Sequence, residues 1–192
     1  VRYQHDPAAP RNRTIGNNNI FQIVEDSDGW LWLSVWNFGL QRFNPATGEF
    51  ISFHYNDEND TSGLLNGSIN AIEGSRYGHR WIGGYLGLEK YDPHTRKFTQ
   101  VPLTKEKNHE IFDLYEDPEG ILWVATSEGL IRYHPESREG KHYTVANGLA
   151  DPFVASIEQD KTGQLWLGTR GGLSRFNPDR EVFETFNKFD GL

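Results

Sequence analysis

The chain has 192 residues, of which 36% are hydrophobic and 14% aromatic, enough apolar material for a buried core. Its formal net charge of -8 disfavours nucleic acid and anionic membrane surfaces as partners. It contains no cysteine, which excludes disulfides, zinc–thiolate sites and cysteine nucleophiles, and no apolar stretch reaches the length of a membrane span.

One pattern occurs four times along the chain: a glycine, a tryptophan three residues later, and then a Gly-Leu pair. The tryptophans are separated by 49, 42 and 43 residues, and they are Trp32, Trp81, Trp123 and Trp166. The glycines of the Gly-Leu pairs are Gly39, Gly87, Gly129 and Gly172. Each unit divides into four short strands joined by Gly, Asn-Pro and Asp-Pro turns, which is typical of a β-propeller blade.

In chain order, the repeat predicts the end of a preceding blade and its connector at 1–19, then blades at 20–66, 67–108, 109–152 and 153–192, the last including the start of another connector. Tyr3 aligns with Tyr55, which indicates the tail of an outer strand. Strands of the last blade are predicted at 154–158, 165–168, 173–176 and 183–186. Since the chain begins at Val1 and contains no Met, we expect a processed product or an excised piece.

Packing between blades is predicted from the second strand of each unit. The residue two positions after each tryptophan lies on the same face of the strand and is always small: Ser34, Gly83, Ala125 and Gly168. A bulky indole beside a small side chain would fit the neighbouring blade. The third blade departs from the pattern because Gly140 replaces the aromatic of the other outer strands, which predicts a weaker strand.

The pattern resembles the two-component regulator propeller repeat. The best matches are Glu116-Asp-Pro-Glu-Gly-Ile-Leu-Trp-Val-Ala-Thr-Ser-Glu-Gly-Leu130 and the corresponding run from Gln159 to Leu173. The resemblance implies the periplasmic or extracellular sensor of a bacterial membrane receptor, with many members responding to carbohydrate breakdown products. We therefore expect an all-β fold of four four-stranded antiparallel blades, forming an arc of a seven-bladed or larger ring. Two alternatives stay open: two copies closing an eight-bladed ring, and four blades closing alone.

Candidate ligand-binding residues lie where connectors and the turns between second and third strands share one face, because loops on a rigid scaffold carry binding side chains. These residues are Trp36, Asn37, Phe38, Tyr85, Glu128, Arg170 and His109. Aromatic rings beside amides and a guanidinium suit a sugar or another small polar ligand. The alternative is that Trp36 and Phe38 cap the core or contact a further domain. Asp113 belongs to a column with Gln22, Ala71 and Ser156 that could line a wet channel, and it could anchor a ligand.

No catalytic motif, cofactor site or metal site is predicted. The run Asp26-Ser-Asp-Gly29 begins like a calcium loop but lacks the later acidic ligands, so a tight turn is expected. The repeat register places no histidine and acid together on one face. Three functions remain in competition: a ligand-sensing module, a protein-interaction scaffold, and a propeller lyase or hydrolase. Expected partners are a small polar ligand or oligosaccharide, and further blades or a second copy in a homodimer.

Overall fold

A computed structural model describes residues 2–55, 62–104 and 109–187. The chain divides into two compact units, Val1–Val101 and Pro102–Leu192, which are described separately. The described residues contain two short 3-10 helices, η1 (Arg11–Arg13) and η2 (Val145–Asn147). Within the described ranges, no helix has the length and apolar character needed to cross a bilayer.

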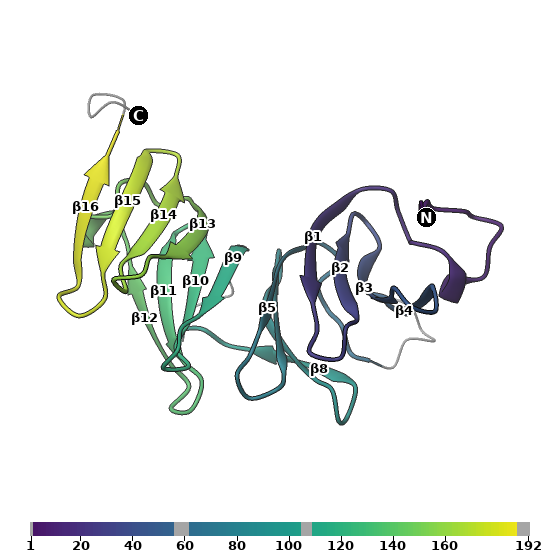
Figure 1. Ribbon diagram of the computed structural model, residues 1–192. Helices are drawn as coiled ribbons and strands as arrows, with labels where there is room; N and C mark the ends of the chain where they lie inside the picture. The colour runs from purple at the N-terminus through teal and green to yellow at the C-terminus, as the bar shows by residue number, and fades with distance from the viewer. Residues whose placement is uncertain (1, 56–61, 105–108, 188–192) are drawn as a thin grey trace. The chain divides into compact units, whose positions relative to one another are not determined.

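Each unit contains two four-stranded antiparallel sheets, with neighbouring strands consecutive in sequence (Figure 1). The strands of the first unit are β1 (Ile20–Glu25), β2 (Leu31–Val35), β3 (Gly39–Asn44), β4 (Glu49–Phe53), β5 (Ile69–Gly74), β6 (Arg80–Gly84), β7 (Gly87–Asp92) and β8 (Lys97–Val101). Those of the second are β9 (Ile111–Glu116), β10 (Leu122–Thr126), β11 (Gly129–His134), β12 (Glu139–Tyr143), β13 (Val154–Gln159), β14 (Leu165–Thr169), β15 (Gly172–Asn177) and β16 (Val182–Phe186). The predicted fold class is confirmed, and the predicted strands of the last blade are correct to within one residue.

The four sheets share one geometry, which follows from their turns. The glycine of each Gly-Leu pair begins the third strand with φ between 99° and 142°, a conformation that other residues rarely adopt. At Gly39, a Cβ atom would lie 2.7 Å from the carbonyl oxygen of Phe53 in the outer strand. The tight turn into the third strand therefore requires glycine.

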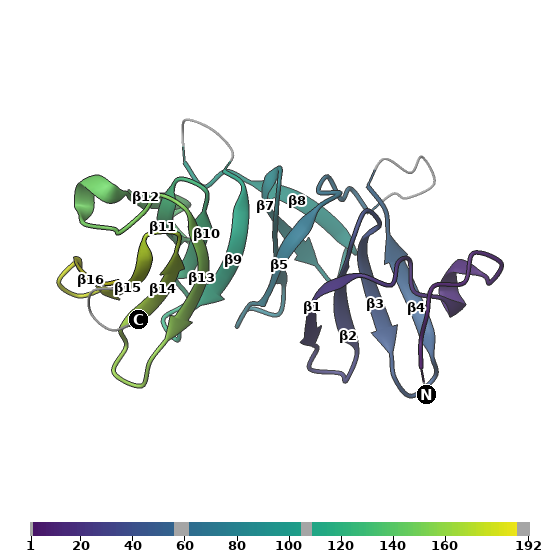
Figure 2. The same ribbon diagram turned by 90° about the horizontal axis from the view of Figure 1, so that it is seen from above.

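In each unit, the two consecutive sheets lie beside one another (Figure 2). The tryptophan of the first sheet belongs to one core cluster with apolar residues of the second. In the first unit, Trp32 contacts Tyr91 with ring centroids 5.0 Å apart. In the second, Trp123 contacts Phe176 at 5.8 Å. Both indoles are 1% exposed, whereas Trp166 of the last sheet is only partly buried.

An aspartate six residues before the tryptophan accepts its indole N–H in three of the four blades. The pairs are Trp32 Nε1 to Asp26 Oδ2 at 2.9 Å, Trp123 Nε1 to Asp117 Oδ2 at 2.8 Å, and Trp166 Nε1 to Asp160 Oδ2 at 2.9 Å. Since a buried N–H without an acceptor is costly, this bond permits the indole to be buried.

Hydrogen bonds also join the two sheets of each unit. They are made by side chains of the column Gln22, Ala71, Asp113 and Ser156, one residue of which lies in the first strand of each sheet. Gln22 Oε1 accepts the backbone N–H of Ile72 at 2.6 Å, and Asp113 Oδ2 accepts that of Ile157 at 2.8 Å. Ala71 of the same column is 1% exposed. The described contacts of Gln22 and Asp113 therefore connect sheets.

A side chain at Gly140 would overlap the carbonyl oxygen of Leu103, and the Leu103 side chain is 4% exposed. Gly140 itself is exposed, as are Glu139 and Lys141 on either side of it. That this outer strand is weaker than the others stays a prediction.

The N-terminal segment packs on the first sheet through Tyr3, whose ring lies 4.6 Å from that of Phe43 and 6.1 Å from that of Phe50. Tyr143 makes the matching contacts in the second unit, 4.9 Å to Phe176 and 6.1 Å to Phe183. The structural equivalent of Tyr3 is therefore Tyr143, the last residue of an outer strand, and not Tyr55 as the alignment predicted.

Candidate functional site

The first unit contains a groove of about 490 Å³, which is the candidate ligand site. Its lining residues are Asn37, Tyr55, Gly67, Ser68, Tyr85 and Leu86. Tyr85 is 66% exposed, Tyr55 47% and Leu86 41%, so two aromatic rings and an aliphatic side chain face solvent beside an amide and a hydroxyl. This combination can stack on an apolar face of a ligand and hydrogen-bond its polar groups.

A buried carboxylate fixes the connector that lines this groove. Glu89 of β7 is 1% exposed, and it accepts the backbone N–H groups of Leu65 and Asn66 at 2.8 and 3.0 Å. The Asn66 side chain donates to Glu89 at 2.7 Å and accepts the N–H of Leu86 at 2.7 Å. Burial raises the pKa of Glu89, although these donors oppose the rise. The clamp connects the core of the sheet to the turn that carries Tyr85.

The turn and the connector also meet directly through their backbones. Tyr85 N donates to Ser68 O at 3.1 Å. A side chain at Gly84 would overlap Ser68 O, which leaves only glycine able to precede Tyr85 at this approach. This backbone hydrogen bond therefore keeps the turn that carries Tyr85 next to the connector that carries Ser68.

The other predicted residues of the first unit divide between surface and packing. Trp36 is 46% exposed and contacts Phe21 edge to face at 5.3 Å. Asn37 has φ 51° and lines the groove. Phe38 packs on His54 at 4.5 Å and against Gly16, so its described contacts are those of a packing residue.

The second unit has a larger groove, about 1210 Å³, beside β12. The predicted residues His109 and Glu128 both line it, and they meet with His109 Nδ1 3.5 Å from Glu128 Oε2. His109 is 5% exposed, and its ring lies 5.2 Å from that of His142. His142 Nε2 lies 3.1 Å from the carbonyl oxygen of Glu128. The expectation that no histidine and acid come together was therefore wrong, because the connector before β9 brings His109 to the turn after β10.

Arg170 and Asp113, also in the second unit, have other described contacts. The Arg170 guanidinium carbon lies 3.9 Å from the ring centroid of Phe153, a cation–π contact. Asp113 accepts the N–H of Ile157, as described above, and of Leu114 at 2.9 Å. Burial raises the pKa of Asp113, while the two donors lower it in part.

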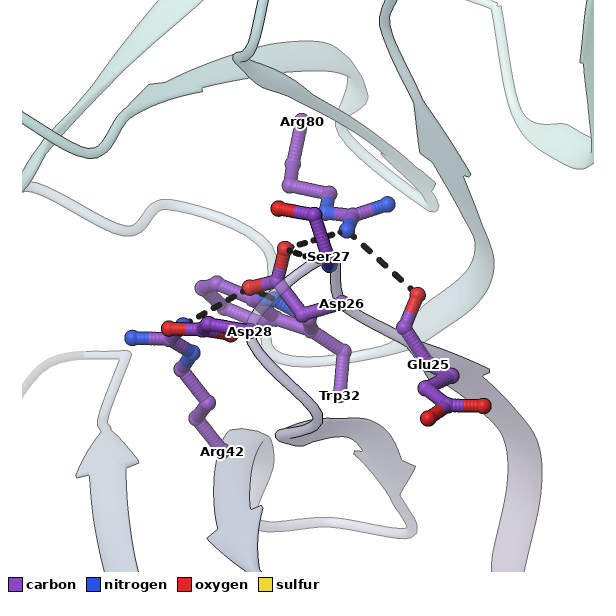
Figure 3. A network of polar contacts seen from close by, with 7 residues as sticks. All are labelled: Glu25, Asp26, Ser27, Asp28, Trp32, Arg42 and Arg80. Atoms are coloured by element: carbon purple, nitrogen blue, oxygen red, sulfur yellow. Dashed lines mark hydrogen bonds and ion pairs between the residues drawn. The ribbon is translucent and has the colours of Figure 1, made fainter.

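The Asp26 turn carries a network of charges (Figure 3). Arg80 donates to Asp26 Oδ1 at 2.6 Å, and Arg42 donates to Asp26 Oδ2 at 2.8 Å and to Asp28 Oδ2 at 2.6 Å. Burial alone would raise the pKa of Asp26, but Trp32 and the two guanidinium groups outweigh it and keep that pKa below its ordinary value. Gly29 N bonds Asp26 O at 3.0 Å, so the run forms a tight turn whose first carboxylate faces arginines. Among the described residues, no group of three histidines or acids is placed to hold a metal ion.

Sequence reasoning missed Tyr55, His142 and the indole-bonding aspartates. The aspartates carry a usable signal, since Asp26, Asp117 and Asp160 each precede a tryptophan by six residues, although turn chemistry alone accounts for an aspartate at this position. The sequence gives no signal for His142 or Tyr55, because only folding brings His142 near His109 and Tyr55 near Tyr85.

Comparison with known proteins agrees with this architecture. The two component regulator propeller family profile matches residues 14–37, 105–128 and 148–171. The strands of the second blade, β5–β8, lie outside the three matched segments, and this blade has Gly74-Ser75 where the others have Glu-Asp or Gln-Asp. No curated protein matches the chain.

Several solved structures share the fold. The extracellular domain assigned to the hybrid two component system BT3049 of B. thetaiotaomicron is 24% identical, with a TM-score of 0.81, over 96% of this chain and 25% of that one. The extracellular domain of BT4673 from the same organism is 23% identical, with a TM-score of 0.80, over 97% and 28%. Virginiamycin B lyase of Staphylococcus aureus is 13% identical, with a TM-score of 0.67, over 90% and 57%.

The chain spans about a quarter of the length of the two B. thetaiotaomicron domains. At these identities the structural likeness establishes the β-propeller fold alone. Three segments of the chain match the two component regulator propeller profile, and the described residues form four-stranded antiparallel sheets as propeller blades do.

Proposed function

We propose that the chain is a non-catalytic ligand-binding module of the extracytoplasmic sensor of a bacterial signalling receptor, and that it recognises a carbohydrate or a similar small polar ligand. The groove between Tyr55 and Tyr85 is the observation that carries the proposal. Exposed aromatic rings beside an amide and a hydroxyl match the alternating apolar and polar surfaces of a sugar. The family repeats and the fold shared with extracellular domains of two-component systems support the sensor role and its place outside the cytoplasm.

Thermal shift against a panel of neutral and acidic oligosaccharides tests the proposal, because a ligand that binds only the folded chain stabilises it by about 2.7 kcal/mol at 100 times its Kd. We expect Tyr85→Ala to weaken binding about 2- to 12-fold, since an aromatic contact contributes about 0.5–1.5 kcal/mol. Tyr77→Ala is the matched control, because Tyr77 is 54% exposed and does not line the groove. Equal loss in both variants, or no shift with any sugar, contradicts the site.

The His109–Glu128 pair favours a second candidate, a lyase or hydrolase that uses these side chains for proton transfer. The shared fold with virginiamycin B lyase does not by itself support turnover, since one fold hosts many functions. Chromatography of the oligosaccharide panel after prolonged incubation separates the two functions. Product that forms with the wild-type chain and not with His109→Ala would replace the binding proposal with an enzymatic one. If the chain binds a protein partner stably and no sugar shifts its unfolding temperature, the third function, a protein-interaction scaffold, would be favoured.

A further inference from the structure

The larger groove of the second unit lies where the third blade departs from the repeat. In the other blades the third strand ends in Asn44, Asp92 or Asn177, whose side chain accepts backbone N–H groups of the following turn at 2.8–3.2 Å. The third blade has His134 at this position. Among the described residues, no hydrogen bond joins the His134 side chain to its turn, and this side chain lines the groove instead.

A second departure lies on the neighbouring outer strand. The other blades place an aromatic residue of the outer strand opposite one of the third strand, as Phe50 lies opposite Phe43, whereas Tyr133 lies opposite Gly140. Gly140 lines the groove, and a side chain there would overlap the carbonyl oxygen of Leu103. The third blade thus gives up a turn-forming side chain and an aromatic pair at adjacent positions. Such a local break with the rules of a fold indicates a functional site.

Imidazole side chains gather in this groove. Three of the seven histidines of the chain line it, and they are His109, His134 and His142. His134 and His142 are half-buried. His142 Nε2 lies 3.1 Å from the carbonyl oxygen of Glu128, which can only accept, so a further proton on this ring goes to Nδ1. Histidine gains a positive charge as the pH falls through about 6.5, and the charged ring donates from both nitrogens.

Two of the charged side chains in the lining already have an opposite charge beside them. Glu128 Oε2 lies 3.5 Å from His109 Nδ1, so protonation of His109 forms an ion pair and leaves no net charge there. Lys141 Nζ bonds the two carboxylate oxygens of Glu181 at 2.7 and 2.5 Å, which cancels the Lys141 charge. The sign of the groove therefore depends on the rest of its lining.

The rest of the described lining becomes positive in acid. Its other ionised side chains are Arg138 and Glu139, whose formal charges cancel, so protonation of His134 and His142 leaves two positive charges. We propose that this groove binds a ligand carrying an oxyanion, a carboxylate or a sulfate group, and that the two imidazoles take up protons as it binds. Arg138 donates to the oxyanion at any pH, and the imidazoles add charged donors below about pH 6.5.

Titration calorimetry of the full chain at about pH 5.5 and about pH 7.5 tests the proposal, because histidine titrates between these values. The probes are digalacturonate, its neutral counterpart galactobiose, and sodium sulfate, all at one ionic strength. We expect an oxyanion to bind about tenfold more tightly at the lower pH, with a heat that depends on the buffer because protons are taken up. Galactobiose should bind equally at both. Digalacturonate binding more tightly than sulfate assigns the oxyanion to an acidic sugar, and the reverse order assigns a free anion.

His134→Asn removes one imidazole and restores the amide that ends the third strand in two other blades, so the variant should fold. We expect it to lose about tenfold in oxyanion affinity at the lower pH, since hydrogen bonds to charged groups are strong. His94→Asn is the matched control, because His94 is exposed in the corresponding turn of the second blade, outside the groove, and its loss changes the net charge equally. His142→Gln is a second test, since an amide can still donate to the Glu128 carbonyl oxygen.

The proposal is overturned if neither oxyanion binds more tightly in acid. It is also overturned if His134→Asn and His94→Asn weaken binding equally, because the effect would then come from the net charge of the whole chain. Tyr85→Ala should leave the acid-dependent binding unchanged, since Tyr85 lines the groove of the first unit. Loss of that binding in Tyr85→Ala would show that the second unit holds no oxyanion site, whereas failure of the sugar proposal alone would leave the acid-dependent binding intact.

Discussion

At the scale of single residues, the repeat depends on a carboxylate that serves a turn and an indole together. Asp160 accepts the backbone N–H groups of Thr162 and Gln164 at 2.8 and 3.1 Å, and its other oxygen accepts the indole N–H of Trp166. In the second blade, Ser75 stands at the equivalent position, and Arg80 replaces the leucine of the other second strands. Arg80 instead bonds Asp26 of the sheet before it. One aspartate therefore serves the tryptophan of its own blade and a charge of the next.

This geometry predicts acid sensitivity. Hydrogen bonds from Thr162 and Trp166 lower the pKa of Asp160 from 3.8 to about 2. The Asp160 carboxylate therefore binds a proton more readily in the unfolded chain than in the folded one. Its contribution to folding stability is present above pH 3.8 and is lost as the pH falls through 2. We expect the free energy of unfolding of Asp160→Asn to fall less steeply than that of the wild type between pH 4 and pH 2.

Urea unfolding at several pH values measures this slope. Asp179→Asn is the control, because the described bond of Asp179 is made by its backbone N–H to Asn177 at 3.0 Å. The control should retain the wild-type slope. A parallel decline in all three proteins would show that the Asp160 carboxylate is not linked to folding.

At the scale of elements, buried polar side chains of the third strands hold the connectors. Gln41 accepts the N–H of Gly16 at 2.8 Å, Glu89 holds Leu65 and Asn66, and Ser174 accepts the N–H of Ala150 at 3.3 Å. All three side chains are at most 1% exposed and follow the leucine of a Gly-Leu pair. These three connectors therefore each have an acceptor at the same repeat position, where the third blade has Ile131.

Because Glu89 meets three donors, an amide cannot replace it. In Glu89→Gln, one acceptor becomes an N–H₂ group facing other N–H groups, and we expect a loss of about 1–3 kcal/mol in the stability of the first unit. The same variant should also weaken the binding of any ligand in the groove, since Glu89 holds Asn66 and Asn66 positions Leu86. Chemical unfolding and ligand titration measure the two effects. Gln41→Glu is the reciprocal variant, because Gln41 Nε2 donates to Ser52 at 2.9 Å and a carboxylate cannot donate that bond. Unchanged stability in Glu89→Gln would contradict the clamp.

The strands were predictable from the sequence because their signals are local. Glycine turns and the alternation around each tryptophan define each strand within a few residues. The site was less predictable. Asn37 and Tyr85 were placed on the correct turns, but Tyr55 joins the groove because its ring packs against Gly67, a contact that no repeat position indicates. Repeat register also carries no information about where Phe38 turns its ring or how close His109 comes to Glu128.

At the scale of the whole chain, each unit contains one complete pair of sheets, β1–β4 with β5–β8 and β9–β12 with β13–β16. The stabilising effect of a repeat position therefore depends on whether a sheet covers it. Ile157 belongs to the core cluster that contains Trp123, and it is 6% exposed. Ile23 is also an isoleucine at the same repeat position, but it is 59% exposed.

We expect Ile157→Ala to destabilise the second unit by about 2–5 kcal/mol, because it leaves a cavity against the tryptophan face. Ile23→Ala should change the stability of the first unit by less than about 0.5 kcal/mol, the usual range for an exposed position. Denaturant unfolding followed by tryptophan fluorescence compares the two. Equal losses would mean that Ile23 is already covered in solution, and the open face of the first sheet would then be filled by the chain itself. A large loss at Ile157 alone would show that the strength of this repeat lies in the contact between sheets and not in the single blade.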